Sequence, residues 1–374
     1  MLFCAATCIG CKKNSIGAQG GASAGNSSAS SGLRKVKIGY VGLTCDTDMF
    51  VAYEKGFFKD EGLDAELVKF EWAALRDGLS LGQVDATHHL VMFLLKPIEQ
   101  GVDIRLTGAV HRGCLRVQAG VNSGIKTVAD LKGRRIGVPG LGTPPHILAI
   151  RALVAAGLDP KKDVEFKVFA ADQFSLAFDR GLIDACGDSE PIGTMLLQTK
   201  KVHNVVDQAT DAPYKDEYCC AVMVSGKLVR NEPEIAAKIT RAILKGSKWV
   251  NTNPTAAARL AVEKNYIAAT PELNAIALSH LAYVPSIEEA PRAVISAAAE
   301  MKKAGLLEPR TDPDALAKRG FAPLPGVSEE WIKELQVEKV AGGGPMLEAE
   351  VAEAMAKITP ADAGRVKTCC IAKK

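Results

Sequence analysis

Aromatic residues are scarce in this sequence, at 5% of 374 positions, and neither sign of charge predominates. The 46 basic and 43 acidic residues are scattered along the chain and leave a net charge of +3. No basic stripe is therefore available to neutralise a phosphate backbone. The shortage of aromatic rings also argues against a stacking platform for single strands. We expect no nucleic-acid partner.

Long apolar runs are missing as well. Beyond the N-terminal leader, no stretch reaches the roughly 18 consecutive apolar residues that a membrane-spanning helix needs. The hydrophobic content is nevertheless 47%, which over 374 residues is enough to build two α/β lobes, each with its own core.

The ten cysteines do not follow a disulfide or zinc-binding spacing after the leader, where no C-x-x-C pattern occurs. Adjacent pairs such as Cys219 and Cys220 seldom bridge to each other, because the backbone between them would have to distort. Metal knuckles need intervening residues between their ligands. We interpret these cysteines as small buried hydrophobes with reduced thiols, and we expect no cofactor.

Cys11 is the most informative residue near the N-terminus. It follows a short apolar stretch and precedes Lys12, Lys13 and a tract rich in Gly, Ser, Ala and Asn. This order is typical of a bacterial lipoprotein, so we expect residues 1–33 to be a leader and flexible tether, with lipid on Cys11. The protein would then lie in the periplasm or at the cell surface. Because the apolar stretch is short and Cys8 occupies the usual leucine position, a disordered tail is the alternative.

Short β-branched runs alternate with helical stretches from Val36 onward, which predicts an α/β fold with a mostly parallel sheet. A helix is expected over 50–61. A second cycle of this kind follows the strand at 115–121, and long helical patterns, including 271–281 and 287–304, follow the strand at 218–225. These two strands are the expected crossings between lobes.

The crossings divide the chain into expected units. Lobe one comprises 34–115 plus 222–326 and is discontinuous, whereas lobe two comprises 116–221. Residues 327–374 form a C-terminal extension with few core-sized side chains, for which we expect loose packing.

Several runs of sequence resemble one protein family. They are KIGYVG, AYEKGFFKDEGLDAELV, LRDGLSLGQVDATH, KTVADLKGRRIGVPG, ILAIRALVAAGLDPKKDV and RGLIDACGDSEP, within residues 35–321. Together they resemble the periplasmic substrate-binding proteins of the nitrate/sulfonate/taurine and thiamine-precursor class of ABC transporters. The KGFFKDEGLDAELV run is rather specific, because a helix that ends on a left-handed Gly62 must lead directly into a strand.

The resemblance implies a type II periplasmic-binding fold, in which two Rossmann-like lobes joined by two hinge crossings close over a small solute. It implies an extracytoplasmic binding component of an ABC importer rather than an enzyme, with permease and ATPase subunits as partners. The expected solute is a small anion or organic sulfonate. Open α/β sheets bind ligands beyond the carboxyl ends of their strands, where helix N-termini favour negative charge.

Candidate ligand contacts are polar or aromatic residues at the expected strand ends. The resemblance places Trp72, in EWAALRD, where nitrate-like members carry a tryptophan, and His146 where they carry a histidine. Glu190 matches the family's GEP element, and Lys215 lies near a cleft lysine of nitrate-like members. The other candidates, chosen from their positions, are Thr44, Asp46, Thr47, His88, Arg112 and Thr143.

Trp72, His146 and Lys215 together would offer an apolar wall, a switchable donor and a fixed charge, which suits a small oxyanion. Cys45 and Cys114 argue against nitrate itself, because thiols are weak hydrogen-bond donors.

Two alternatives use the same residues. In an enzyme on this fold, of the thiamine-pyrimidine, menaquinone-pathway or sulfinate-hydrolase type, Cys45 or Cys114 would be the nucleophile, with a histidine as base. The candidate bases are His88, His89 and His146. A metal site built from His88, His89 and Asp46 is disfavoured, because adjacent residues of a strand point to opposite faces. We therefore expect no metal site.

Overall fold

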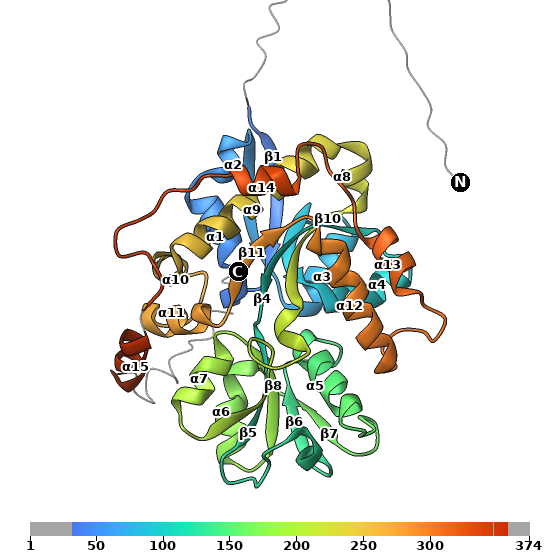
Figure 1. Ribbon diagram of the computed structural model, residues 1–374, viewed down its shortest axis with the longest axis vertical. Coiled ribbons are helices and arrows are strands. Elements are labelled where there is room, and N and C mark those ends of the chain that lie inside the picture. The colour runs from blue at the N-terminus through green and yellow to red at the C-terminus, as the bar shows by residue number, and fades with distance from the viewer. Residues whose placement is uncertain (1–31, 347, 358–374) are drawn as a thin grey trace, which may run out of the picture. The chain divides into compact units, whose positions relative to one another are not determined.

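Two separate sheets organise the chain (Figure 1). The computed structural model describes residues 32–346 and 348–357, so Cys11, the tether and the Cys369–Cys370 pair lie outside the described residues. Sheet A has the strand order β11-β4-β10-β3-β1-β2, and sheet B has the order β7-β6-β8-β5-β9. The expectation of an α/β fold is confirmed.

Sheet A consists of β1 (Arg34–Tyr40), β2 (Leu63–Lys69), β3 (Ala86–Leu90), β4 (Ile104–Arg112), β10 (Tyr218–Ser225) and β11 (Ala282–Ser286). Sheet B consists of β5 (Leu115–Gly120), β6 (Arg135–Val138), β7 (Glu165–Val168), β8 (Ala185–Ser189) and β9 (Val202–Asp207).

Most strands of each sheet run in one direction, as predicted, but both sheets are mixed, because each also contains antiparallel pairs. β1 pairs in parallel with β2 and β3, and β6 with β7 and β8. In contrast, β10 runs antiparallel to β3 and β4, and β5 runs antiparallel to β8 and β9. The reason is topological: β5 and β10 are the strands by which the chain enters a sheet from the other one, and they run against the βαβ units there.

β11 was not expected from the sequence, because its five residues include Pro285 and lie between two strong helical patterns. It pairs antiparallel with β4 at the edge of sheet A. An edge position tolerates proline, since no further strand needs its missing N–H.

Helices cover both faces of each sheet (Figure 1). The helices on one side of sheet A are α1 (Thr47–Glu54), α9 (Pro233–Thr252), α10 (Pro254–Glu263) and α11 (Pro271–Ser279); those on the other side are α3 (Trp72–Ser80), α4 (Val91–Glu99), α12 (Glu289–Lys303) and α13 (Pro313–Gly320). Sheet B lies between α5 (Pro144–Ala155) on one side and α6 (Phe174–Asp179) with α7 (Ile192–Gln198) on the other. The remaining helices are α2 (Phe57–Asp60), α8 (Gly226–Asn231), α14 (Glu329–Glu334) and α15 (Glu348–Lys357), and the 3-10 helices are η1 (Thr44–Asp46), η2 (Val128–Leu131), η3 (Ala171–Gln173) and η4 (Tyr214–Asp216).

The helix expected over 50–61 is two helices, because Gly56 adopts a left-handed φ of 77° between α1 and α2. Gly62 also has a φ of 77° and leads directly into β2, as predicted. A left-handed backbone is cheap only for glycine, so these two positions set where the helices stop.

The chain crosses from sheet A to sheet B at Gly113 and Cys114, between β4 and β5. Gly113 has a φ of 75°, and a Cβ there would lie 2.4 Å from the carbonyl oxygen of His280. Cys114 also has a positive φ, of 137°. The return crossing runs from β9 to β10, and all eight residues of β10 belong to sheet A although the expected boundary fell at 221 and 222. It stays a prediction that the two sheets, with their helices, move as separate lobes about these crossings.

The sheets also meet away from the crossings. The Thr44 N–H donates to the carbonyl oxygen of Glu190 at 3.1 Å, which joins the end of β1 to the end of β8. The largest buried apolar cluster contains residues of both sheets, such as Ile38 and Val117.

The described part of the C-terminal segment is held to the protein at several points, although most of its side chains are half-buried or exposed. Val327 and Ile332 are buried, and the Val340 N–H donates to Asn253 Oδ1 at 2.7 Å. Asn253 Nδ2 donates back to the Glu338 carbonyl oxygen at 2.9 Å. A buried asparagine at the junction of α9 and α10 therefore holds a segment that has little apolar surface of its own.

Among the described residues, we find no helix with the length and apolar character needed to cross a membrane.

Candidate functional site

A buried group of polar side chains lies where β1, β3, β4 and β10 end or begin near the crossing to sheet B. His88 of β3 and Asp48 of α1 are fully buried, and His88 Nδ1 lies 2.8 Å from Asp48 Oδ2. Burial opposes the imidazolium, but the charge and hydrogen bond of Asp48 outweigh it and raise the pKa of His88. His88 is thus held in a fixed orientation with Nε2 directed away from the carboxylate.

The His111 ring of β4 lies 5.2 Å from that of His88, with an angle of 27° between the planes. Its Nδ1 lies 3.2 Å from the Arg112 carbonyl oxygen. Burial, reinforced by the charge of His88, lowers the pKa of His111 to about 3, so this ring is neutral at physiological pH.

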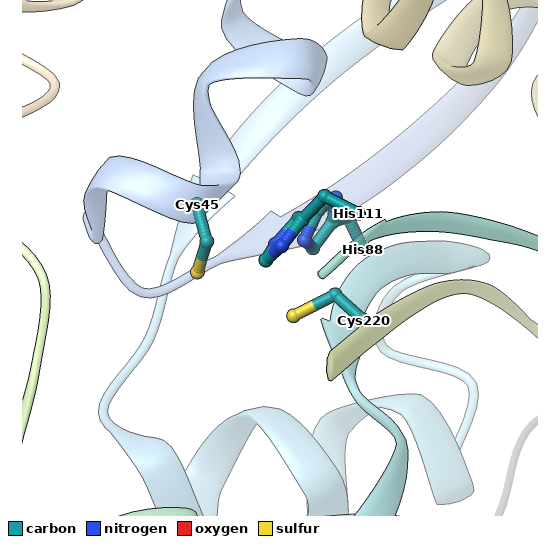
Figure 2. Close-up of side chains that lie close together, drawn as sticks. All are labelled: Cys45, His88, His111 and Cys220. Carbon is teal, nitrogen blue, oxygen red and sulfur yellow. The ribbon is translucent and has the colours of Figure 1, made fainter. Parts of the chain in front are cut away.

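Thiols surround these two rings. Cys45 of η1 and Cys220 of β10 are fully buried, and their sulfur atoms with nitrogens of His88 and His111 all lie within 4.8 Å of one another (Figure 2). Burial raises the pKa of Cys45 and Cys220 well above that of an exposed thiol. Hydrogen bonds from Cys219 and Cys45 instead lower the pKa of Cys114.

Strand register explains this convergence. Cys220 is paired with His111 across β10 and β4, and Val222 is paired with His88 across β10 and β3. Paired residues of antiparallel strands share a face, and so do residues two apart along a strand. His88, His111 and Cys220 therefore share one face of sheet A, whereas His89, opposite Ala221, faces the other way.

Sheet B contributes a buried guanidinium with three carboxylates. Arg116 of β5 lies 2.7 Å from Glu190 and 3.1 Å from Asp207. Asp188 is also close enough for its charge to raise the pKa of Arg116. Burial raises the pKa of Glu190 to about 7. Burial, together with the charge of Glu190, also raises the pKa of Asp188 well above its usual range. One guanidinium cannot stabilise three buried carboxylates, so protons remain on this group near neutral pH.

A surface cavity of about 490 Å³ lies elsewhere, between α10, α11, residues 342–346 and Glu350. It is lined by none of the residues described above, so the candidate site rests on the buried polar groups and not on this cavity.

A family model described as the NMT1-like family matches residues 29–263, which is more than half of the chain. The chain belongs to the NMT1-like family.

Curated relatives of this NMT1-like chain include the nitrate/nitrite binding protein NrtA of Nostoc, 27% identical over 240 residues, covering 58% of this chain and 53% of that protein. The nitrate import ATP-binding protein NrtC of Synechococcus elongatus is 26% identical over 182 residues, covering 43% of this chain and 27% of that protein. The NMT1-like chain thus spans about half or less of the length of these two relatives.

Solved structures share the fold. A protein of Bordetella bronchiseptica has a TM-score of 0.66 at 24% identity, covering 80% of this chain and 96% of that one. The periplasmic nitrate-binding protein NrtA of Synechocystis has a TM-score of 0.66 at 16% identity, covering 81% and 88%. The alkanesulfonate-binding protein SsuA of Xanthomonas axonopodis has a TM-score of 0.63 at 17% identity, covering 77% and 98%. The NMT1-like chain therefore has the periplasmic-binding-protein fold.

The three candidates after β1 bond within the protein. Asp46 Oδ2 accepts the N–H groups of residues 41–43, at 2.8 to 3.1 Å. Thr44 Oγ1 donates to Asn274, and Thr47 Oγ1 donates to the Thr44 carbonyl oxygen. These side chains shape the turn that carries Cys45, and their polar atoms are already used.

Trp72, His146 and Lys215 have different surroundings. Trp72 packs against His89, at 5.4 Å between ring centroids. His146 lies edge-on to Phe166 at 4.4 Å, while Lys215 is exposed on η4. That the three residues act together on one solute stays a prediction.

His146 is a neutral ring in this structure. Its Nδ1 accepts the Gly142 N–H at 2.9 Å, and burial lowers its pKa to about 4. Nε2 therefore carries the proton and is the nitrogen left to donate. The expected charge switch at this position would need strongly acidic conditions.

The remaining candidates lie close to the crossings or to helix α5. Arg112 ends β4, and its guanidinium lies over the Tyr218 ring at 4.8 Å with Nε lacking a partner among the described residues. Glu190 faces Arg116 and accepts from Thr194. Thr143 precedes α5, but its hydroxyl donates to the Gly140 carbonyl oxygen rather than capping the helix.

Sequence reasoning missed His111, Cys220, Arg116 and Asp188. His111 directly precedes Arg112, and Cys220 lies in a strand that reads as uniformly buried, so neither stands out by pattern. Only the β4–β10 register brings them together.

Proposed function

We propose that this protein is the extracytoplasmic solute-binding component of an ABC importer, which binds a small anion between its two sheets and releases it unaltered to a permease. The observation that carries the proposal is the family match over residues 29–263. The names of the curated relatives support it, since they include a nitrate/nitrite binding protein and a nitrate import ATP-binding protein.

Donor groups near the crossings are consistent with an anion. Arg112 Nε and one terminal nitrogen of Arg116 are buried without a hydrogen-bond partner among the described residues. Asp188 Oδ1 also lacks a partner among the described residues, and burial raises the pKa of this carboxyl, which favours its protonated, hydrogen-bond-donating form. We propose Arg112 as the principal cationic contact.

Catalysis is not proposed. The Cys45 thiol is buried and its raised pKa keeps it protonated, which makes it a poor nucleophile. Cys114 has a lowered pKa, but the groups that lower it first are other thiols rather than a base.

A binding screen with the full chain tests the proposal. Isothermal titration calorimetry and thermal unfolding would be measured with nitrate, nitrite, bicarbonate, taurine, an alkanesulfonate and a thiamine-precursor pyrimidine. We expect one anion to bind with 1:1 stoichiometry and, at about 100 times its Kd, to stabilise the fold by about 2.7 kcal/mol.

The matched variants are Arg112→Met, expected to weaken that binding at least tenfold, and Arg105→Met on the same strand, expected to leave it unchanged. Arg105 pairs with Asp103 instead. Failure of every anion to bind would contradict the anion-binding proposal. Turnover of any of them that Cys114→Ala abolishes would contradict release of the solute unaltered.

We further propose that Cys11 carries a lipid that anchors the protein to a membrane, since it follows a short apolar stretch and precedes a polar tract. After export in a bacterial host, the full chain should fractionate with membranes and Cys11→Ser should be released. Cys8→Ser is the matched control and should stay with the membranes; release of both variants, or of neither, counts against lipid on Cys11.

A further inference from the structure

Four metal-binding atoms converge on one buried spot in sheet A. They belong to Cys45, His88, His111 and Cys220, which come from η1, β3, β4 and β10, and Figure 2 shows these side chains grouped together. All four residues are completely buried. Residues this far apart in the sequence meet only because of the fold.

Both imidazoles are oriented as metal ligands are. Each uses Nδ1 toward a protein oxygen, that of Asp48 for His88 and that of the Arg112 backbone for His111. Each leaves Nε2 buried and without a hydrogen-bond partner among the described residues. A carboxylate or carbonyl on the second nitrogen is the arrangement that fixes a metal-binding histidine. An unused buried ring nitrogen is otherwise costly, because it has lost its water.

The chemistry of the four ligands selects the ion. Thiolate sulfur and neutral imidazole suit soft or borderline cations such as Zn²⁺ and Cu⁺, whereas Mg²⁺ and Ca²⁺ require oxygen ligands. Metal binding would displace the thiol protons of Cys45 and Cys220 and would use an unprotonated nitrogen of each imidazole.

We propose that Cys45, His88, His111 and Cys220 form a binding site for one thiophilic cation, Zn²⁺ or Cu⁺, with Asp48 as the residue that positions His88. The proposal goes beyond the proposed function and does not depend on it. It concerns a metal ion at sheet A, whichever anion the protein carries.

The spacing of the atoms is compatible with a tetrahedral ion. Zn–S and Zn–N bonds of about 2.3 and 2.0 Å place ligand atoms roughly 3.3–3.8 Å apart. The four atoms already lie within 4.8 Å of one another, so the longest separation would have to shorten by roughly 1–1.5 Å. The metal site disfavoured from the sequence used His89 and Asp46, which differ from this set: His89 packs against Trp72 and Phe93 on the other face.

The site has no exposed side chain. Cys45 adjoins Thr44, whose N–H bonds to the Glu190 carbonyl oxygen and joins the two sheets. A bound ion would therefore be shielded from water by the surrounding protein.

The test uses the full chain, reduced and stripped of metal under anaerobic conditions. Zn²⁺, Cu⁺ and Co²⁺ are added separately and free ion is removed. We expect elemental analysis to find one equivalent of Zn²⁺ or Cu⁺ on the protein. Comparing the zinc and copper samples decides which of these two ions is retained better. Co²⁺, as a spectroscopic stand-in for Zn²⁺, should give tetrahedral d–d bands together with thiolate charge-transfer bands.

Variants assign the site. Cys220→Ser and His111→Asn should abolish stoichiometric binding, whereas Asp48→Asn should weaken it about 10- to 100-fold while keeping the cobalt spectrum. Cys186→Ser and His203→Asn are the controls: Cys186 is buried in β8 outside the cluster, and His203 bonds the Ile125 carbonyl oxygen. Both should bind as the unmodified chain does.

Three outcomes would overturn the proposal. The first is that no ion is retained by the reduced unmodified chain. The second is an octahedral cobalt spectrum without thiolate bands, a result that does not require any variant to fold. The third is unchanged binding in a folded Cys45→Ser, Cys220→Ser double variant, which would assign the ion to other side chains, such as the neighbouring Cys114 and Cys219. None of these results bears on whether an anion binds, so the two proposals fail separately.

Discussion

His88 Nδ1 lies 2.8 Å from Asp48 Oδ2, and neither side chain exposes any surface. The pair joins β3 to α1, and its partners are far apart in the sequence. Because both groups are out of water, each depends on the other for its charge or hydrogen bond. Removing one partner from such a pair costs more than forming the pair gains.

The first prediction concerns Asp48→Asn, measured in a metal chelator so that only folding is reported. Asp48 raises the folded pKa of His88 above 6.5. This contribution to stability is therefore fully present below pH 6.5 and is lost as pH rises through the folded pKa. We expect the substitution to lower the free energy of unfolding by about 3–5 kcal/mol near pH 6, and by less near pH 8.5.

The matched control for that experiment is Asp60→Asn, because Asp60 pairs with Lys245 at 3.0 Å on the surface. It should cost less than about 1 kcal/mol. If urea unfolding shows equal losses in the free energy of unfolding for the two variants, the buried pair contributes no more to stability than the surface pair.

The second prediction concerns acid stability and His89, whose two ring nitrogens lack partners among the described residues. Burial, with the charge of His88, lowers its pKa to about 3. A base with a depressed folded pKa stabilises the fold above its unfolded value of 6.5 and loses that contribution as pH falls toward 3. His89→Phe should retain contact with Trp72 and shift the acid unfolding midpoint, followed by circular dichroism, to lower pH. An unchanged midpoint would show that His89 does not limit acid stability.

The third prediction concerns the crossing between the sheets. Gly113→Ala would place a Cβ 2.4 Å from the His280 carbonyl oxygen at a φ of 75°. The control Gly124→Ala has nearly the same φ, 74°, and meets nothing within 4 Å. The control should cost about 1–2 kcal/mol for the left-handed backbone alone. Gly113→Ala should cost clearly more in thermal unfolding, and similar costs would mean that the crossing can shift freely.

The fourth prediction concerns Arg116, which is buried between Glu190 and Asp207. Arg116→Met leaves those carboxylates without their cation and should destabilise the fold by about 3–5 kcal/mol. Arg230→Met removes an exposed pair with Asp103 and should cost less than about 1 kcal/mol. Denaturant unfolding of both variants checks this, and a stable Arg116→Met protein would mean that the carboxylates take up protons at little cost.

The local pattern of the sequence predicted most secondary-structure elements closely. β10 has the bounds 218–225 that the sequence indicates, and Gly62 ends a helix where its left-handed backbone requires. These features depend on near neighbours in the chain. β11 was missed because a short edge strand containing Pro285 is specified by its partner β4 and not by its own residues.

The candidate site shows the same division. The sequence by itself determined that polar residues follow β1 and β3 and that His88 and His89 face opposite ways, since alternation along a strand is local. Only the tertiary structure decided that Cys220 lies beside His111 and that Asp48 reaches His88, because pairing between distant strands depends on register and packing across the whole sheet. That register turned four separately unremarkable side chains into one buried cluster.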